Sequence, residues 1–296
     1  MRASIDRFLD HVRYENGCSG NTAAAYSSDL EFFSSYLVSH GVKSWGEVCV
    51  EHVRSFLEFE RSAGMKASTR ERRRVAVKMF FAFLASSETI GENPAETVES
   101  IRRGRALPKV LGEAEMKRLL ESICGVTAFD LRDRALLELM YACGLRVSEA
   151  AALDLSDLDF EGDGLVRCRG KGGKVRVVPV GEEAKRRVLL YLAEGRPVFA
   201  KGASARQEVF LTRLGAPFTR HGISQMLQER AKAAGLEQKV SPHMLRHSFA
   251  TDLLSHGAQI RAIQEMLGHA DISTTQIYTH IDSTRLMEMH KRFFAR

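Results

Sequence analysis

The sequence lacks the cysteine pattern of a disulfide-linked or zinc-binding domain. Its five cysteines are scattered over 296 residues, odd in number and never spaced as a metal-binding pair. Thiols used in this way are typical of proteins that fold in a reducing compartment. We therefore expect each cysteine to be a small buried apolar residue.

Long apolar stretches are also missing. Residues Met1–Arg7 contain no apolar core of a secretory signal peptide, and no uninterrupted apolar run approaches membrane-spanning length. We find no internal repeat and no low-complexity tract. These absences argue against secreted, membrane-spanning and repeat proteins, and they predict a cytoplasmic protein.

The length and the charge distribution indicate two regions of different character. The chain is longer than one ordinary core requires, which predicts two domains and a linker. Residues 1–100 contain 12 basic and 14 acidic residues, whereas residues 101–296 contain 31 and 23. Because the whole chain has a net charge of +6, the excess lies in the second region. We expect phosphate contacts to be densest there.

Apolar residues at helical spacing predict four helices in residues 1–100. They recur from Ile5 to Val12, from Tyr26 to Leu37, from Val53 to Leu57 and from Ala76 to Leu84. A helical domain with an apolar interior is the expected fold of this region.

The last of these stretches also carries a basic stripe. Arg70, Arg74 and Lys78 recur at helical spacing, with Arg72 and Arg73 beside them. Taken alone, such a stripe is as often a solvated face as a binding surface. Because we expect phosphate contacts in the second region, we interpret the stripe as a further set of phosphate contacts.

A basic linker is predicted at residues 101–109, after the bundle ends at Asn93-Pro94. Its Arg102, Arg103 and Arg105 are further candidates for phosphate contact. A linker of this kind lets two domains close around a duplex from opposite sides.

The second domain begins near Val110 and mixes helices with strands. Helical patterns cover Met116–Ile123 and Leu136–Met140, and a β-hairpin is predicted from 165–169 and 175–180 around a glycine-rich turn. Further helical patterns occupy 182–194, 219–234, 243–255, 259–267 and 283–295. The predicted fold class is mainly α with a small β hairpin or sheet.

Four segments of this domain hold residues suited to attack on a phosphodiester. They are Gly144-Leu145-Arg146-Val147-Ser148-Glu149, Gly170-Lys171-Gly172-Gly173-Lys174, Ser241-Pro242-His243-Met244-Leu245-Arg246, and Leu267-Gly268-His269 with the following Thr275-Gln276-Ile277-Tyr278. Each segment alone has an ordinary structural explanation. Arg146 could pair with Glu149 at the surface, and His243 with Arg246 could be a surface pair on a helix.

The chemistry of these residue types is nevertheless complementary. A tyrosine hydroxyl such as that of Tyr278 is a poor nucleophile at neutral pH unless a base accepts its proton. Guanidinium groups such as Arg146 and Arg246 suit the extra negative charge of a five-coordinate phosphorus. A histidine at 243 or 269 can move protons or donate hydrogen bonds. Without further context, Tyr278 would be read as a buried aromatic residue.

With six such positions in this order, the chain resembles the tyrosine recombinase (phage integrase) family along nearly its whole length. The resemblance implies a helical core-binding (SAM-like) DNA-binding domain at 1–100, a basic linker at 101–109 and a mixed α/β catalytic domain at 110–296. Within the family the chain is most similar to XerD-type recombinases. Ser248 and Asp252 depart from that pattern, where Ala and His are expected.

The resemblance assigns a role to each of the six positions. Tyr278 is the nucleophile, Arg146 and Arg246 bind the phosphate, and His243 transfers the proton. Lys171 protonates the departing 5′ oxygen, with Lys174 as the fallback. His269 completes the set.

The implied reaction is site-specific strand exchange through a 3′-phosphotyrosyl link, with no metal, no cofactor and no ATP. The implied partners are a double-stranded DNA recombination site and either a XerC-like recombinase in a heterotetramer or further copies in a homotetramer. A FtsK-type DNA translocase is a further expected partner, and chromosome dimer resolution at cell division is the expected role. We expect the helix at 283–295 to dock on a neighbouring protomer.

Three alternatives remain open from sequence. A mobile-element integrase shares the chemistry, and a type IB topoisomerase shares the nucleophile but acts alone to relax supercoils. A non-catalytic DNA-binding regulator would use the same scaffold without cleavage. The target sequence is not readable from the chain, because base readout depends on groove geometry.

Overall fold

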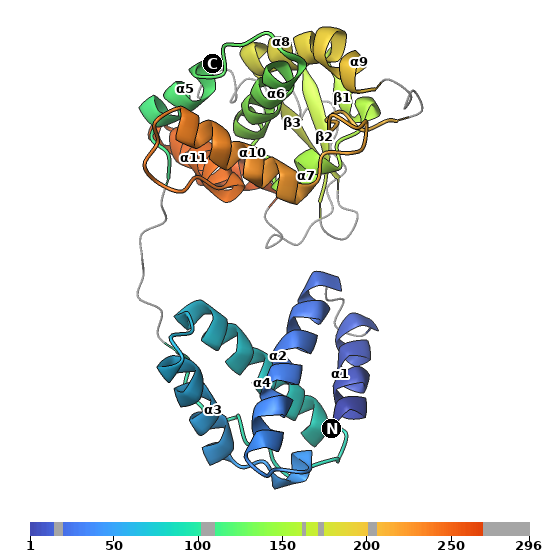
Figure 1. Cartoon of the computed structure of the whole chain (residues 1–296), viewed down its shortest axis with the longest axis vertical. Helices are drawn as coiled ribbons and strands as arrows, with labels where there is room; N and C mark the ends of the chain where they lie inside the picture. Colours follow the sequence, from blue (N-terminus) through green and yellow to red (C-terminus); the bar gives the residue numbers. More distant parts are fainter. Residues whose placement is uncertain (15–19, 102–109, 162–163, 171–174, 201–205, 269–296) are drawn as a thin grey trace. The chain divides into compact units, whose positions relative to one another are not determined.

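The computed structural model describes residues 1–14, 20–101, 110–161, 164–170, 175–200 and 206–268. The chain divides into two units, Met1–Leu107 and Pro108–Arg296. Figure 1 traces the helices and strands of both units, and each unit has a hydrophobic core of its own. None of the described helices is long and apolar enough to cross a membrane.

The first unit consists of helices whose apolar faces meet in an aromatic core. Its elements are α1 (Arg2–Tyr14), α2 (Gly20–Ser39), the short 3₁₀ helix η1 (Trp45–Glu47), α3 (Val50–Ser62) and α4 (Ala67–Ser86). Trp45 packs edge-on against Phe80, with ring centroids 4.7 Å apart, and Phe33 meets Phe56 at 4.8 Å. The four predicted helices are confirmed, because their apolar stripes are the faces that fill this core.

The second unit is built mainly from helices. They are α5 (Glu113–Glu121), α6 (Ala128–Ala142), α7 (Val147–Ala151), η2 (Leu155–Asp157), α8 (Glu182–Leu190), the π-turn η4 (Tyr191–Gly195), α9 (Arg196–Phe199), α10 (Arg220–Ala233), α11 (Pro242–Ser255) and α12 (Ile260–Leu267). The pattern at 182–194 is thus not one regular helix, because it passes into a π-turn from Tyr191. The pattern at 283–295 lies outside the described residues.

Three antiparallel strands form a small sheet in this unit, in the order β1-β2-β3. Strands β2 (Leu165–Arg169) and β3 (Val175–Pro179) pair with Val166 opposite Val178. This confirms the predicted hairpin. The two-residue strand β1 (Leu158–Asp159) was not predicted, since two residues are too few to show alternation.

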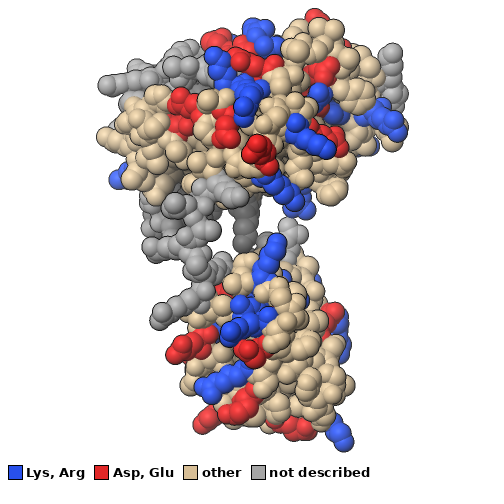
Figure 2. Space-filling view, turned by 60° about the vertical axis from the view of Figure 1, so that its left-hand side comes forward, with Lys and Arg blue, Asp and Glu red and all other residues tan. Residues whose placement is uncertain are grey.

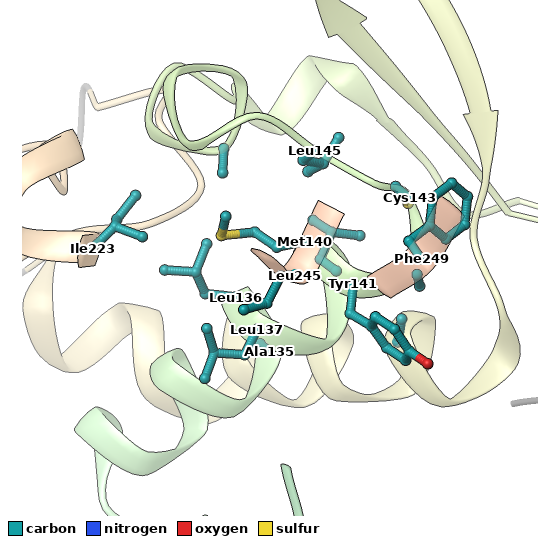
Figure 3. Packing of buried hydrophobic residues seen from close by; sticks show 14 of the residues in the cluster. Ala135, Leu136, Leu137, Met140, Tyr141, Cys143, Leu145, Ile223, Leu245 and Phe249 are labelled. Carbon is teal, nitrogen blue, oxygen red and sulfur yellow. The ribbon is translucent and has the colours of Figure 1, made fainter. Parts of the chain in front are cut away.

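Helix α6 is the central element of the second unit (Figure 1) and contacts α5, α7, α8 and α11. All its residues from Leu131 to Ala142 are buried. In Figure 3, Leu136 and Met140 of α6 lie among side chains of later helices, including Leu245 of α11 and Ile223 of α10. A helix buried on all sides fixes the position of whatever follows it, and the first candidate arginine follows directly.

Candidate active site

The chain turns sharply at Gly144 after α6 and passes close to α11 and α12. The φ angle of Gly144 is +56°, which favours glycine. A Cβ atom there would lie 2.5 Å from a ring carbon of Phe249 and 2.8 Å from a methyl group of Leu267. No other residue type fits this space, so the turn places Arg146 beside the end of α12.

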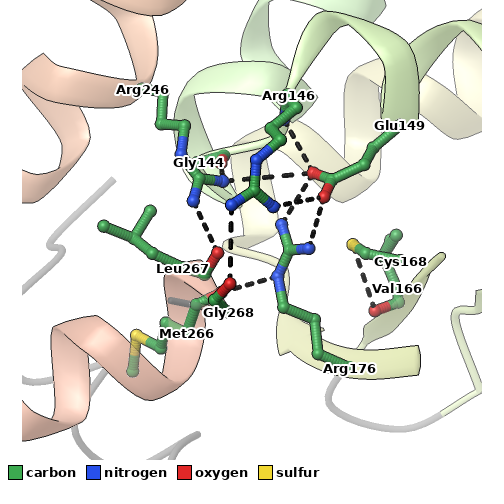
Figure 4. Close-up of polar contacts among 10 residues, drawn as sticks. All are labelled: Gly144, Arg146, Glu149, Val166, Cys168, Arg176, Arg246, Met266, Leu267 and Gly268. Atoms are coloured by element: carbon green, nitrogen blue, oxygen red, sulfur yellow. Dashed lines mark hydrogen bonds and ion pairs between the residues drawn. The ribbon is translucent and has the colours of Figure 1, made fainter. Parts of the chain in front are cut away.

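Arg146 lies at the surface edge of a polar cluster (Figure 4) and caps helix α7. Its backbone N–H donates to Oε2 of Glu149 at 2.7 Å, and its Nη1 donates to Oε1 at 2.8 Å. Its Nη2 reaches the carbonyl of Gly268 at 3.4 Å. The pairing with Glu149 that sequence suggested is therefore present, but the Arg146 side chain is 40% exposed while the Glu149 side chain is only 2% exposed.

Arg246 lies on α11, buried within the same cluster. Its Nη1 donates to the carbonyl of Gly144 at 2.6 Å, and its Nη2 donates to the carbonyl of Leu267 at 2.5 Å. The nearest carboxylate oxygen, Oε2 of Glu149, is 4.0 Å away. Neutral carbonyls thus hold this guanidinium in a fixed orientation without neutralising it.

The surroundings of Arg246 disfavour its charge. Burial, followed by repulsion from Arg146 and Arg176, lowers the pKa of Arg246 to about 10. Arg246 therefore remains protonated at neutral pH, but its positive charge is incompletely compensated. A bound anion would relieve that cost.

Glu149 is the carboxylate at the centre of the cluster. Burial opposes its ionisation, but hydrogen bonds and charge attraction from Arg176, with bonds from Arg146, outweigh burial and lower the pKa of Glu149 to about 2. Among the residues drawn in Figure 4, three guanidinium groups therefore surround one permanently charged carboxylate. The excess positive charge can bind a singly charged phosphodiester and stabilise the second negative charge that develops on it during attack.

His243 lies in the first turn of α11, which begins at Pro242 after the N-cap residue Ser241, close to the start of the pattern predicted at 243–255. The His243 side chain is exposed, whereas that of Arg246 one turn later is buried. The histidine is thus open to an approaching substrate on the helix that holds the buried arginine.

Three of the six candidate residues lie outside the described residues: Lys171, His269 and Tyr278, together with the fallback Lys174. Their neighbours in the sequence are described. Gly170 ends the segment after β2 and Val175 opens β3, which brackets Lys171 within the hairpin connection. Gly268, whose carbonyl accepts from Arg146, immediately precedes His269.

Two members of the predicted basic stripe on α4 form ion pairs within their own unit. Arg73 donates to Oδ1 of Asp29 at 3.1 Å and also pairs with Glu60, and its side chain is only 12% exposed. Arg74 is buried, binds Glu71 at 2.9 Å and donates to the carbonyl of Val98 at 3.1 Å. Both are structural ion pairs because their carboxylate partners lie inside the same unit.

The remaining members of the stripe are more accessible. The side chain of Arg72 is 43% exposed although it pairs with Asp29, and that of Lys78 is 36% exposed beside Glu96. Arg70 is half-buried, and Arg102, Arg103 and Arg105 lie outside the described residues. On the face shown in Figure 2, basic and acidic side chains are interspersed over each unit.

Sequence reasoning missed Arg176, which joins the cluster from β3. The clue was its place in the strand, since alternation puts Arg176 on the same inward face as Val178. The inward placement of this charged side chain is favourable only because it pairs with Glu149, which is 27 residues away in the sequence. Ser248 and Asp252, the two residues that depart from the expected pattern, also make internal contacts. The Ser248 hydroxyl bonds both backbone groups of Leu111, and Asp252 accepts from Tyr141 at 2.5 Å.

No group of three or more histidine, cysteine or acidic side chains with metal-binding geometry occurs in the part of the chain that the structure describes. The described cluster is instead rich in arginine. Its chemistry is that of an anion site.

Comparison with known proteins places both units. Residues 5–88 match the phage integrase N-terminal SAM-like domain, and residues 109–285 match the phage integrase family. The tyrosine recombinase XerD of Listeria monocytogenes serotype 4b is 38% identical over 297 residues, covering 100% of both chains. The tyrosine recombinase XerC of a Roseiflexus species is 40% identical over 95% of this chain and 90% of that protein.

A solved structure shares the fold of the whole chain. It is the XerH site-specific recombinase bound to a palindromic difH substrate in a post-cleavage complex, with a TM-score of 0.72. The match covers 97% of this chain and 83% of that one at 24% sequence identity. The two matched domains and the full-length relatives show that this chain belongs to the phage integrase family of tyrosine recombinases.

Proposed function

We propose that this chain is a site-specific DNA recombinase that cuts a strand with Tyr278, holds it as a 3′-phosphotyrosyl link and passes it to a partner strand. The proposal rests on the charge and the contacts of Arg146 and Arg246. Their charges exceed what Glu149 neutralises, and both contact the backbone just before His269. Family membership supplies the nucleophile and the reaction class.

Each cleavage step exchanges one phosphoester bond for another. The phenolic oxygen of Tyr278 bonds to phosphorus while the bond from phosphorus to the 5′ oxygen breaks. The phenolic proton passes to His243, and Lys171 delivers a proton to the departing 5′ oxygen. A 5′ hydroxyl of the partner strand then attacks the link and frees the tyrosine. The bond count is unchanged, so no ATP is consumed.

Arg146 and Arg246 act on the charge that develops in between. The phosphorus centre gains a negative charge at the five-coordinate stage, and fixed guanidinium groups stabilise that stage more than the starting diester. Removal of one such donor typically costs about 100- to 1,000-fold in rate. His269 adds a hydrogen bond to the same oxygens, as the family pattern implies.

DNA contacts outside the centre are assigned to the accessible basic residues. Arg72 and Lys78 keep exposed side chains on α4, and the linker residues Arg102, Arg103 and Arg105 are retained as contacts. These side chains bind phosphates and set the register of the protein on the duplex, without reading sequence.

The assembly is a tetramer on two DNA sites, with the helix at 283–295 docked on a neighbouring protomer. The similar identities to a XerD and a XerC leave two compositions, a heterotetramer with a XerC-like partner and a homotetramer. We assign the chain to chromosome dimer resolution, with a FtsK-type translocase as a further partner. Mapping the recombined junctions in cells tests this assignment. Chromosome dimer resolution should give junctions at a single chromosomal site, whereas integration of a mobile element should not.

A nicked suicide substrate tests the reaction. Loss of a short 5′ fragment traps the covalent link, so the wild-type protein should migrate with the DNA under denaturing conditions. Tyr278→Phe should bind the DNA and form no adduct. The matched control is Tyr191→Phe, since Tyr191 is fully buried and bonds the backbone of Leu211; it should still form the adduct. Binding by wild type without any adduct would refute the proposal in favour of a non-catalytic regulator.

A further inference from the structure

Arg176 is the arginine of the cluster that is fully paired inside the protein. It lies on β3 opposite Cys168 and is 6% exposed. Arg246 is equally buried, but it lies 4.0 Å from Glu149, whereas Arg176 forms two hydrogen bonds with that carboxylate and is not free to bind a phosphate. Its effect on the reaction must pass through the groups that it holds.

Each of the three guanidinium nitrogens of Arg176 donates a hydrogen bond (Figure 4). Nη1 donates to Oε1 of Glu149 at 2.6 Å, and Nη2 donates to Oε2 at 2.8 Å. Nε donates to the carbonyl of Met266 at 2.8 Å. A lysine cannot reproduce this set, because its ammonium group lacks the planar fork.

Both partners of Arg176 are also linked to the two phosphate-binding arginines. Glu149 accepts from the backbone and the side chain of Arg146. The segment after Met266 accepts from Arg246 at Leu267 and from Arg146 at Gly268. Arg176 thus joins α7 to the end of α12, and it fixes the two anchors of the arginines relative to each other.

Packing reinforces this link at the end of α12. A Cβ atom added to Gly268 would lie 3.0 Å from Cδ of Arg176. The arginine stem therefore rests against the last described residue before His269.

We propose that Arg176 is a positioning residue for strand cleavage, which holds Glu149 and the end of α12 so that Arg146 and Arg246 face one phosphate. This inference rests on the proposed function. It adds a strand residue of the hairpin to a centre whose other members come from α7, α11, the hairpin connection and the segment after α12.

The charge environment of Glu149 supplies a diagnostic readout. The groups that face Glu149 are Arg146, Arg176, Arg246 and the thiol of Cys168. Burial raises the pKa of that thiol to about 12, so it is neutral in the working range. Burial raises the pKa of Glu149, and the attraction of Arg176 opposes that effect. Without Arg176 the pKa of Glu149 therefore rises. The carboxylate then protonates on mild acidification and releases Arg146.

The second unit offers a matched control. Arg132 is also 6% exposed, donates twice to Oδ1 of Asp133 at 2.9 and 2.7 Å, and donates to the carbonyl of Leu211 at 3.2 Å. It has the same burial and the same kinds of partner, but it is not part of the arginine cluster around Glu149. Substitutions of Arg132 therefore measure the general cost of disturbing a buried arginine.

The experiment compares Arg176→Met and Arg176→Lys with Arg132→Met and Arg132→Lys. Single-turnover adduct formation on the nicked substrate is measured across pH, with DNA affinity and folded fraction for each protein. We expect Arg176→Met to cleave about 100-fold more slowly than wild type after correction for folded fraction, with DNA affinity little changed. Arg176→Lys should be intermediate, and the Arg132 variants should cleave at the rate of their folded fraction.

The pH profile separates positioning from mere structural support. Arg176→Met should lose activity as the pH falls through an acid limb that wild type and Arg132→Met lack, and the limb should vanish in Arg176→Met combined with Glu149→Gln. Equal corrected rates for the Arg176 and Arg132 variants would overturn the inference, as would a slow Arg176→Met with an unchanged pH profile. Should Arg176→Met fail to fold, Arg176→Lys decides by the same comparison. Absence of an adduct with wild type would instead count against the proposed function.

Discussion

The two units each bury a cluster of arginines and carboxylates, and the two clusters differ in their charge balance. In the first unit, Arg72 and Arg73 meet Asp29 and Glu60, two cations with two anions. In the second, Arg146, Arg176 and Arg246 share Glu149 alone among the described residues drawn in Figure 4.

The carboxylates respond in opposite directions. Burial raises the pKa of Asp29 and of Glu60 despite the nearby arginines. In the second unit, the bonds from Arg176 and Arg146 overcome burial and lower the pKa of Glu149 to about 2. The first cluster is thus closed on itself and serves the fold. Among the described residues, the second keeps positive charge in excess.

The largest effect on the difference between the two clusters is expected from removing a cation that no carboxylate neutralises. Arg246→Gln should lower the cleavage rate by about 1,000-fold, because a fixed cation at the developing charge is lost. The melting temperature should change by only a few degrees, since burial and repulsion already disfavour this charge. Adduct kinetics and calorimetry measure the two effects. A variant that cleaves normally would remove Arg246 from the centre.

The corresponding change in the first unit should affect stability and spare chemistry. Arg73→Met leaves buried Glu60 without its ion-pair partner and should cost about 3–5 kcal/mol of unfolding free energy. Urea unfolding followed by fluorescence reports on this unit, because Trp45 is the only tryptophan of the chain and lies in its core. Arg72→Met, whose side chain is 43% exposed, is the control and should cost about 1 kcal/mol or less.

Acid should affect the two clusters with opposite signs. Glu149 has a folded-state pKa of about 2, below the ordinary value near 4.3, so its stabilisation is present above pH 4.3 and is lost as the pH falls toward 2. Relative to Glu149→Gln, wild type should lose about 1.5 kcal/mol between pH 5 and pH 3. Glu60 has a raised pKa, so wild type should gain relative to Glu60→Gln as the pH falls from 7 to 5.

Hydrogen exchange resolved along the chain measures each cluster in its own unit. Amides of α7 and β3 report on Glu149, and amides of α3 and α4 report on Glu60. Parallel pH slopes in the two units would contradict the distinction between a closed and an open cluster.

Local patterns predicted most of the helices and strands, because the periodicity of their apolar residues can be read from residues close together in the sequence. The helices of the first unit, the hairpin and the start of α11 at Pro242 were readable for that reason. Helix α6 was read only in part, since buried charged residues interrupt its apolar pattern, namely Arg132, Asp133, Arg134 and Glu138. The short strand β1 gave too few residues for any pattern.

Contacts between distant segments were not readable. Arg74 follows the basic spacing of α4, yet it is buried because the carbonyl of Val98 lies within reach. Arg176 is 27 residues from Glu149 and 90 from Met266, so only the folded chain shows their bonds. Arg146 and Arg246 were found because they belong to motifs of a known family, and the structure brings both to the same carboxylate.

The most direct measurement is the identity of the tyrosine that carries DNA. Protease digestion of the trapped adduct, followed by mass spectrometry of the nucleotide-linked peptide, should give one peptide that contains Tyr278. Tyr141 and Tyr191 are 5% and 0% exposed, and their hydroxyls bond to Asp252 and to the backbone of Leu211 inside the second unit, so we expect neither to carry DNA. A nucleotide on another tyrosine, or no linked peptide from protein that binds the substrate, would contradict the account.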